Sequence, residues 1–405
     1  MMHRLRYIVL CLLAVMALTS VQAKEASNGL KFFYRVGKWV DKFCLQGLDT
    51  NYITLPEHSW RVSFNTGSVG IHSDYASYSE EIDAYFLLHL RTTPSMELGF
   101  NAGFRGFGFG YSWDVLNAYA SNMNFSLGGK SIGLEFMRHV STNLKGTVSL
   151  SNFPEIPAPI DQGYFWITNI NLSAWYALNS KHYSHNAAIK QSYIQKKTAG
   201  SLLVSLSYMN TDLSMHDTTV YDGVPGISLF LDQVTHVVTH QVSVGLGYGI
   251  NYTPNNGKVL IHAAAFAQLV CYSINQVSFA VADSIQLPGK PYYNIKPKTP
   301  VHVTGTVRAA VSWEINEWVH LSAWAQFNNI RFTSHEKEMT RLMMSNWNWQ
   351  AHLTVGVRFG AGKKRVHEAL ANDPLPEKMT IELPKPRKPT PQWITDYFYS
   401  SHFGQ

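Results

Sequence analysis

Residues 241–252 read QVSVGLGYGINY, and every second residue of this stretch is apolar or aromatic. The even positions carry Val242, Val244, Leu246, Tyr248, Ile250 and Tyr252, whereas glutamine, serine, glycine and asparagine occupy the odd positions. Successive side chains of a β-strand point to opposite faces, so the stretch predicts a strand with one apolar wall and one polar wall.

The same alternation recurs in VHVTGTVRAAVSWE (301–314), VHLSAWAQFN (319–328) and AHLTVGVRF (351–359). The runs are about 10 to 16 residues long, above the roughly five or six of an ordinary strand. Many end in aromatic residues such as Trp313, as do strands at the two interfaces of a membrane barrel. A soluble β-sandwich also alternates, but run length and aromatic ends favour a transmembrane barrel.

Composition agrees with a barrel. Charged residues make up 15% of the 405-residue chain and aromatic residues 13%, whereas a soluble domain carries roughly 25% charged residues. The net charge of +6 is weak for this length and spread along the chain, so we expect no nucleic-acid partner. After residue 23, no stretch is apolar over the length that a spanning helix requires.

Residues 1–23 resemble a secretory signal peptide. Arg4 and Arg6 precede an apolar run over 7–18, and Val21-Gln22-Ala23 places small residues where a signal peptidase cleaves. The apolar run is shorter than a membrane-spanning helix, which argues against a retained anchor. We therefore expect export, with the mature chain in the outer membrane of a Gram-negative bacterium and both termini in the periplasm.

At two places the apolar residues switch between even and odd positions, and these phase changes decide the strand count. The apolar positions are even up to Phe104 and odd from Phe107, so Arg105-Gly106 is either a tight hairpin or a bulge. Single-chain bacterial barrels have even strand numbers, so we take the hairpin, which gives about 12 strands within a range of 10 to 14. We interpret the second change, at Gly128 to Ser131, as a bulge inside one strand.

The prediction is thus an all-β, antiparallel transmembrane barrel over 59–360, after a periplasmic segment (24–58) and before a Pro-rich periplasmic tail (361–405). Residues 30–46 are expected to form a short amphipathic helix. Short links should face the periplasm and long ones the outside, and 179–199 is too long for its predicted side. The predicted strands are 59–73, 81–91, 96–103, 106–113, 122–138, 164–178, 200–213, 240–252, 257–272, 299–314, 318–333 and 347–360.

Three segments resemble a Bacteroidota family known as domain of unknown function 4421. They are GLDTNYITLPEHSWRV (47–62), GFRGFGFGYSW (103–113) and QSYIQKKTAGSLLV (191–204), and the likeness runs from about residue 35 to 360. The resemblance implies an outer-membrane barrel and supplies no catalytic residue.

Polar faces of the last strands supply the candidate site. The expected lumen-facing residues are His302, Arg308, Glu314, His320, His352 and Arg358. Such groups would either pair across a narrow interior and stabilise the wall, or line a path for solutes. We expect no cofactor, metal site or catalytic residue; the pairs His182/His185 and His236/His240 fall in links. Whether Cys44 and Cys271 pair stays open.

The leading functional hypothesis is a non-enzymatic, porin-like channel or a structural envelope protein. The alternatives are an envelope-modifying hydrolase with a serine–histidine site, and a surface-binding protein acting through long outer loops. The expected partners are outer-membrane lipid and, through the 361–405 tail, a periplasmic protein or the cell wall.

Overall fold

A computed structural model describes residues 48–79, 84–93, 95–116, 120–142, 144–151, 153–160, 163, 165–215, 236–254, 257–278, 293–295, 301–333 and 342–360. The predicted signal peptide, the helix over 30–46 and the tail over 361–405 lie outside these residues. Among the described residues, no helix is long and apolar enough to cross a membrane.

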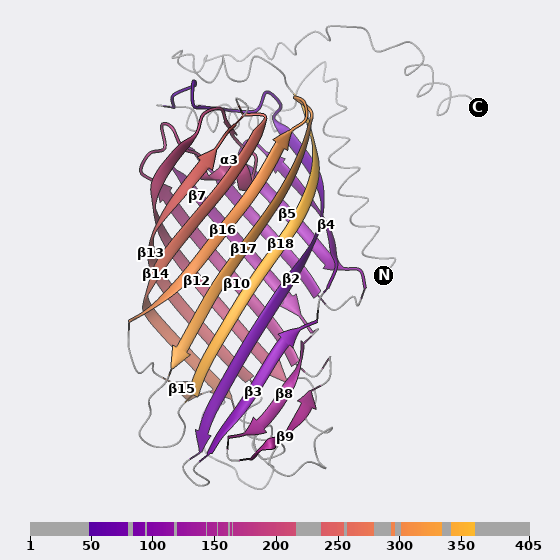
Figure 1. Ribbon diagram of the computed structural model, residues 1–405, viewed down its shortest axis with the longest axis vertical. Coiled ribbons are helices and arrows are strands. Elements are labelled where there is room, and N and C mark those ends of the chain that lie inside the picture. Colours follow the sequence, from indigo (N-terminus) through magenta and orange to yellow (C-terminus); the bar gives the residue numbers. More distant parts are fainter. Residues whose placement is uncertain are drawn as a thin grey trace, which may run out of the picture. The chain divides into compact units, whose positions relative to one another are not determined.

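Twelve antiparallel strands close into a barrel (Figure 1), as the sequence predicts. In order around the wall they are β2 (Trp60–Ser79), β4 (Glu97–Phe104), β5 (Phe107–Asp114), β6 (Ala120–Gly128), β7 (Ile132–Ser141), β10 (Phe165–Ala177), β12 (Ala199–Met215), β13 (His236–Tyr252), β14 (Val259–Ser278), β16 (His302–Glu314), β17 (Val319–Thr333) and β18 (Leu342–Phe359). Pairing of β18 with β2 over their length closes the ring.

Apolar side chains cover the outside of the barrel and polar ones fill its interior. Leu246 on β13 and Phe64 on β2 are exposed over more than 60% of their surface, while Gln241 on β13 is buried. This reverses the distribution of a soluble protein, because the outer face meets lipid and the inner face does not. The molecule therefore has the architecture of an outer-membrane barrel.

The hairpin predicted at Arg105-Gly106 is confirmed. Both residues have positive φ, 47° and 98°, the requirement of a two-residue turn that matches the twist of the two strands. The bulge predicted at Gly128 to Ser131 is wrong: 129–131 form a second hairpin between β6 and β7, closed by the Gly129 N–H donating to the Ile132 carbonyl at 2.8 Å. The predicted strand 122–138 is therefore two strands.

The predicted strand 81–91 is not part of the closed ring. It corresponds to β3 (Ala84–Thr92), which pairs with the second half of β2, while β4 pairs with the first half. β3 also pairs with β8 (Leu144–Leu150), and β8 pairs with β9 (Phe153–Ile160). Together these strands form a sheet that extends β2 beyond the ring. Alternation continues along this extension, so the sequence pattern alone does not mark where the ring ends. The predicted count of 12 is right because two errors cancel: the predicted strand 81–91 lies outside the ring, and the predicted strand 122–138 is two strands.

The two ends of the barrel differ. The short-turn end carries turns 105–106, 129–131, 253–258 and 315–318, whereas the long-link end carries the long connections and the β3–β8–β9 extension. β15 (Tyr293–Ile295) pairs with β14 at the long-link end. One long connection, 178–198, belongs to the short-turn end and contains the only helix among the described residues, α3 (His185–Ile189).

Candidate functional site

Residues 178–198, here called the plug, are the connection that the sequence pattern leaves unexplained. They fold into the short-turn end of the barrel, where α3 appears behind the wall strands in Figure 1 and approaches β13, β14 and β16. β11 (Ile194–Gln195) of the plug pairs with β1 (Ile53–Thr54). Two of the segments that carry the family resemblance, 47–62 and 191–204, are thus joined in one structure.

Apolar packing fixes the plug against the wall. Ile53, Ala187, Ala188 and Tyr193 cluster with Leu260 of β14 and Ala310 of β16, all at most 4% exposed. On the other side, Tyr183 packs with Leu203 of β12, Ala264 and Phe266. Gly249 on β13 leaves room for this tyrosine, since a Cβ there would lie 2.0 Å from the Tyr183 hydroxyl oxygen. Burial of two whole tyrosine rings makes this a packed core and not a loose loop.

The Gln195 carboxamide connects the plug to the wall. Its Nε2 donates to the His182 carbonyl at 2.6 Å and to the Lys197 carbonyl at 2.9 Å. Its Oε1 accepts from the Ser184 amide at 3.1 Å and from Asn251 Nδ2 of β13 at 3.0 Å. Because Gln195 is 1% exposed, losing this amide would leave several buried polar groups unpaired.

A buried charge cluster ties the plug to opposite walls. Glu135 of β7 pairs with Lys190 of the plug and, at 2.9 Å, with Arg308 Nη2 of β16. The Arg308 guanidinium also lies 5.6 Å from the ring centre of Trp175 on β10. Paired and partly stacked, these ions avoid the cost of an isolated charge.

His185 is the titratable residue of α3. Burial, with added repulsion from His262, Arg308 and Lys190, lowers its pKa well below the ordinary 6.5. Its Nδ1 is 3.1 Å from the Tyr183 hydroxyl, and its ring meets the ring of His262 edge-on at 5.0 Å. The docked plug therefore holds this histidine neutral at neutral pH.

The six candidate lumen residues fall into separate groups. Arg308 joins the Glu135 cluster, whereas Arg358 of β18 pairs with Glu314 of β16 through two contacts, one of them 2.8 Å from Nη2 to Oε1. His320 of β17 is fully buried, and His352 stacks on Trp324 at 4.9 Å between ring centres. His302 is partly buried, with its Nε2 3.5 Å from Gln241 Nε2. Together they line several parts of the wall and form no single constellation.

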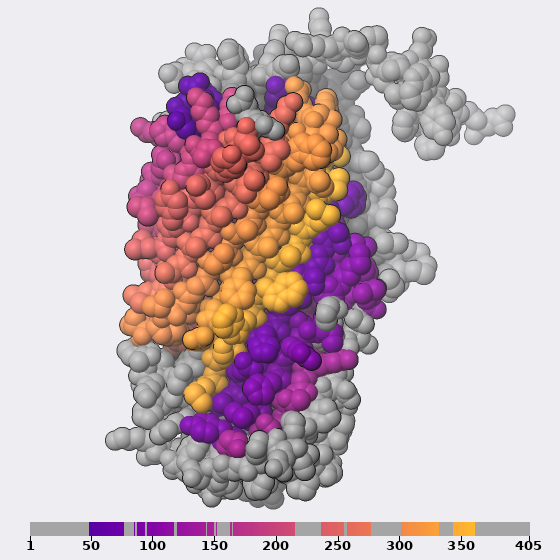
Figure 2. All heavy atoms as spheres, viewed as in Figure 1, coloured from indigo at the N-terminus to yellow at the C-terminus, as the bar shows by residue number. Residues whose placement is uncertain are grey.

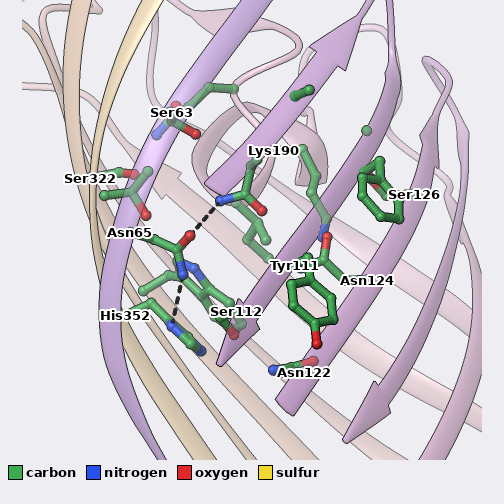
Figure 3. Close-up of a pocket in the computed structure, with 18 of the residues that line it drawn as sticks. Ser63, Asn65, Tyr111, Ser112, Asn122, Asn124, Ser126, Lys190, Ser322 and His352 are labelled. Carbon is green, nitrogen blue, oxygen red and sulfur yellow. Dashed lines mark hydrogen bonds between the residues drawn. The ribbon is translucent and has the colours of Figure 1, made fainter. Parts of the chain in front are cut away.

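The cavity under the plug is polar and small. Hydroxyl and amide groups from β2, β4, β5 and β6 line it, and Lys190 points into it from the plug (Figure 3). Asn65 bridges Asn101 Nδ2 at 3.2 Å and His352 Nδ1 at 3.5 Å. The free space in it is about 50 Å³, which holds a few water molecules.

The glycines of GFRGFGFG have a packing role at this cavity. The Phe residues of β5 point outward, and Gly103 and Gly108 point inward, where the Arg61 side chain of β2 lies over them. A Cβ on Gly103 would lie 2.9 Å from Arg61 Nη2. Because these glycines carry no side chain, the inner face of β4 and β5 leaves room for the Arg61 side chain.

Ser112 and His139 both contact the Glu97 carboxylate inside the barrel. The Ser112 hydroxyl donates to Glu97 Oε2 at 2.6 Å, and His139 Nδ1 is 3.8 Å from the other oxygen of that carboxylate. In a serine–histidine hydrolase the serine is hydrogen-bonded to the histidine, whereas here Ser112 and His139 each contact the same carboxylate. Within the described ranges, no three His, Cys, Asp or Glu residues are grouped to hold a metal. Cys271 is exposed, and its suggested partner Cys44 is outside these ranges.

Sequence reasoning missed Glu135, Lys190 and Gln195. Glu135 follows a hairpin that the sequence pattern does not distinguish from a bulge, and the helix of the plug is too short for a periodic pattern. The available indication was the length of 179–199 on a side where turns are short.

The family model described as Domain of unknown function (DUF4421) matches residues 47–359. The outer membrane protease OmpT of Escherichia coli is 7% identical, covering 76% of this chain and 98% of its own, with a TM-score of 0.35. The translocator domain of autotransporter NalP from Neisseria meningitidis is 14% identical, covering 81% of this chain and 95% of its own, with a TM-score of 0.32. The outer membrane protein OprG of Pseudomonas aeruginosa is 7% identical, covering 76% of this chain and 100% of its own, with a TM-score of 0.26. No curated protein matches the chain.

Proposed function

The chain belongs to the DUF4421 family, and we propose that it is a non-enzymatic structural protein of the Gram-negative outer membrane, a barrel that its own plug keeps closed to solutes. The carrying observation is the plug, which is packed against β12, β13, β14 and β16 and ion-paired to β7. A permanently open channel needs a continuous water path, and a plug that is packed and ion-paired inside one end of the barrel supports a closed one.

The proposed orientation places the short-turn end in the periplasm. Outer-membrane barrels have short periplasmic turns and long outer loops, and the links of this chain divide in that way except for the plug. An epitope tag inserted in the link 216–235 should bind antibody on intact cells. Binding only after the cells are broken would reverse the orientation.

Conductance in a planar bilayer tests the closed state. The purified wild-type barrel should show no steady current steps above those of the detergent control. A variant in which residues 182–196 are replaced by a short Gly-Ser linker should show steps, because the packed core and the Lys190 ion pair are removed. Steady wild-type steps equal to those of the plug deletion would refute the structural role and favour a channel.

Absence of hydrolysis is part of the same proposal. The Ser112 hydroxyl donates a hydrogen bond to the Glu97 carboxylate and not to a histidine, so it lacks the partner that a serine–histidine hydrolase uses. The purified barrel should release no fatty acid from phospholipid or lipid A vesicles, and Ser112→Ala should be indistinguishable from wild type. Release that disappears in Ser112→Ala would establish the hydrolase alternative.

A further inference from the structure

A group of charged side chains lies on the outward face of β2, β3 and β8 beyond the closed ring. This group, here called the basic patch, consists of His72, Asp74, His89, Arg91, Lys145 and, from β17, Arg331. The opposite face of the same extension buries Leu88, Leu90, Leu144 and Val148, so alternation points Arg91 and Lys145 outward. The patch lies on one paired sheet in which β18 separates β17 from β2, β2 pairs with β3, and β3 pairs with β8. Figure 2 shows yellow β18, indigo β2 and purple β3 side by side.

The strand register aligns the cations. His72 is directly opposite Arg91, and Arg91 is directly opposite Lys145. Like charges at directly opposed positions of a sheet repel, and both side chains are exposed. Among the residues that the structure describes, neither Arg91 nor Lys145 has an ion-pair partner. An anion bound between them would relieve the repulsion.

The patch begins beside Trp347 and Trp349 on the outward face of β18. Along β2 and β18 the outward pairs run from Phe64 with Val355 to Gly70 with Trp349, and the next pair is His72 with Trp347. Arg331 lies 5.7 Å from the ring centre of this same Trp347. Aromatic girdles mark the membrane–water interface of barrels, so cations immediately beyond the girdle stand at the depth of lipid headgroups.

Asp74 is the acidic member of the patch. Its Oδ1 is 3.2 Å from His72 Nε2 and 2.8 Å from His89 Nδ1, so both histidines contact the same carboxylate oxygen. Arg91 and Lys145 lie in the neighbouring register row, with His72. Three permanent cations against one carboxylate leave the patch positive even with both histidines neutral.

We propose that the basic patch binds the phosphate groups of lipid A in the outer leaflet, with Arg91 and Lys145 as the principal contacts. Arginine recognises phosphate through two parallel hydrogen bonds, and lysine supplies a point charge beside it. The proposal rests on the proposed orientation, which places the long-link end outside. It gives the closed barrel a specific lipid partner on one side of its wall.

Binding of monophosphoryl lipid A to the full-length barrel in an uncharged detergent, followed by native mass spectrometry, tests the proposal. The wild type should retain the phosphorylated lipid and not the dephosphorylated one. The double variant Arg91→Ala/Lys145→Ala should bind on the order of 10- to 30-fold more weakly. The matched control Lys181→Ala/Lys258→Ala removes two exposed cations at the short-turn end and should bind as wild type does. Heat-modifiable migration on gels confirms that each variant is folded.

Three outcomes overturn the proposal: equal binding of the dephosphorylated lipid, equal binding by the Arg91→Ala/Lys145→Ala variant, or equal loss in the control variant. Phosphatidylglycerol that binds as tightly as lipid A overturns the choice of glycolipid. The surface tag in the 216–235 link and the conductance measurement report separately on orientation and closure. Failure of lipid binding with those two results intact therefore refutes this proposal alone.

Discussion

Arg308 on β16 reaches Glu135 on β7 inside the barrel, with 2.9 Å between Nη2 and Oε2. Four strands, β10, β12, β13 and β14, separate the two around the wall. Lys190 of the plug pairs with the same carboxylate. One acid therefore holds two opposite walls and the plug together, which makes Glu135 the central electrostatic contact of the closed state.

Removing the arginine should weaken the barrel measurably. Arg308→Met leaves Glu135 with Lys190 alone and removes the contact with Trp175. Breaking a buried pair costs about 3 to 5 kcal/mol, and we expect the lower end because Lys190 remains. Urea unfolding in detergent, followed by tryptophan fluorescence, measures the loss.

Arg138→Met is the matched control for this variant. Arg138 lies on the same strand as Glu135 but points outward and is exposed. Because Arg138 lies near the end of β7, its removal should change the free energy of unfolding by at most about 1 kcal/mol. Equal losses in Arg308→Met and Arg138→Met would show that the cross-barrel pair does not stabilise the fold.

Gly249→Ala should displace the plug by steric overlap. The added methyl would lie 2.0 Å from the Tyr183 hydroxyl oxygen and 3.1 Å from Leu203 Cδ1, in a packed region. Overpacking of this kind costs about 1 to 3 kcal/mol. Gly305→Ala is the comparison, because its nearest atom would be 3.7 Å away. Hydrogen exchange of the amides in 183–195 should accelerate in the first variant and stay unchanged in the second; unchanged exchange in both would rule out this contact as a determinant of docking.

Much of the barrel follows from the sequence because a strand wall repeats one rule. The outward and inward rows of β13, β16, β17 and β18 could be assigned from alternation, and so could the interior placement of Arg308 and Arg358. The turn at Arg105-Gly106 could be located because a change of phase has few structural causes.

The rest depends on contacts between distant segments. A phase change at Gly128 to Ser131 fits either a bulge or a hairpin, and only pairing of β6 with β7 decides between them. The pairing of β1 with β11 joins residues about 140 positions apart and leaves no periodic trace in either. For the same reason, neither the plug nor the Gln195 hydrogen bonds could be predicted.

Gln195→Ala should loosen the plug without disturbing the wall. The variant leaves the Ser184 amide, the His182 carbonyl and Asn251 with fewer partners in a buried region. Each unsatisfied group costs about 1 to 3 kcal/mol. Limited proteolysis should cut within 178–198 faster than in wild type, while heat-modifiable migration of the barrel persists. Gln195→Glu retains the acceptor oxygens and should restore only the Ser184 and Asn251 contacts; full protection in the alanine variant would refute the role assigned to the amide.

Acid should undock the plug through His185. Its pKa is held well below 6.5 in the docked plug by burial and by His262 of β14, Arg308 of β16 and Lys190. A histidine whose folded pKa is depressed contributes full stability above its unfolded pKa and loses it as pH falls below that value. Between pH 7 and pH 5, hydrogen exchange of the plug amides should therefore accelerate more in wild type than in His185→Gln, which cannot take up the proton. Since other buried histidines are common to both proteins, the difference between the two pH profiles isolates His185. Parallel profiles would show that protonation of this ring does not govern docking.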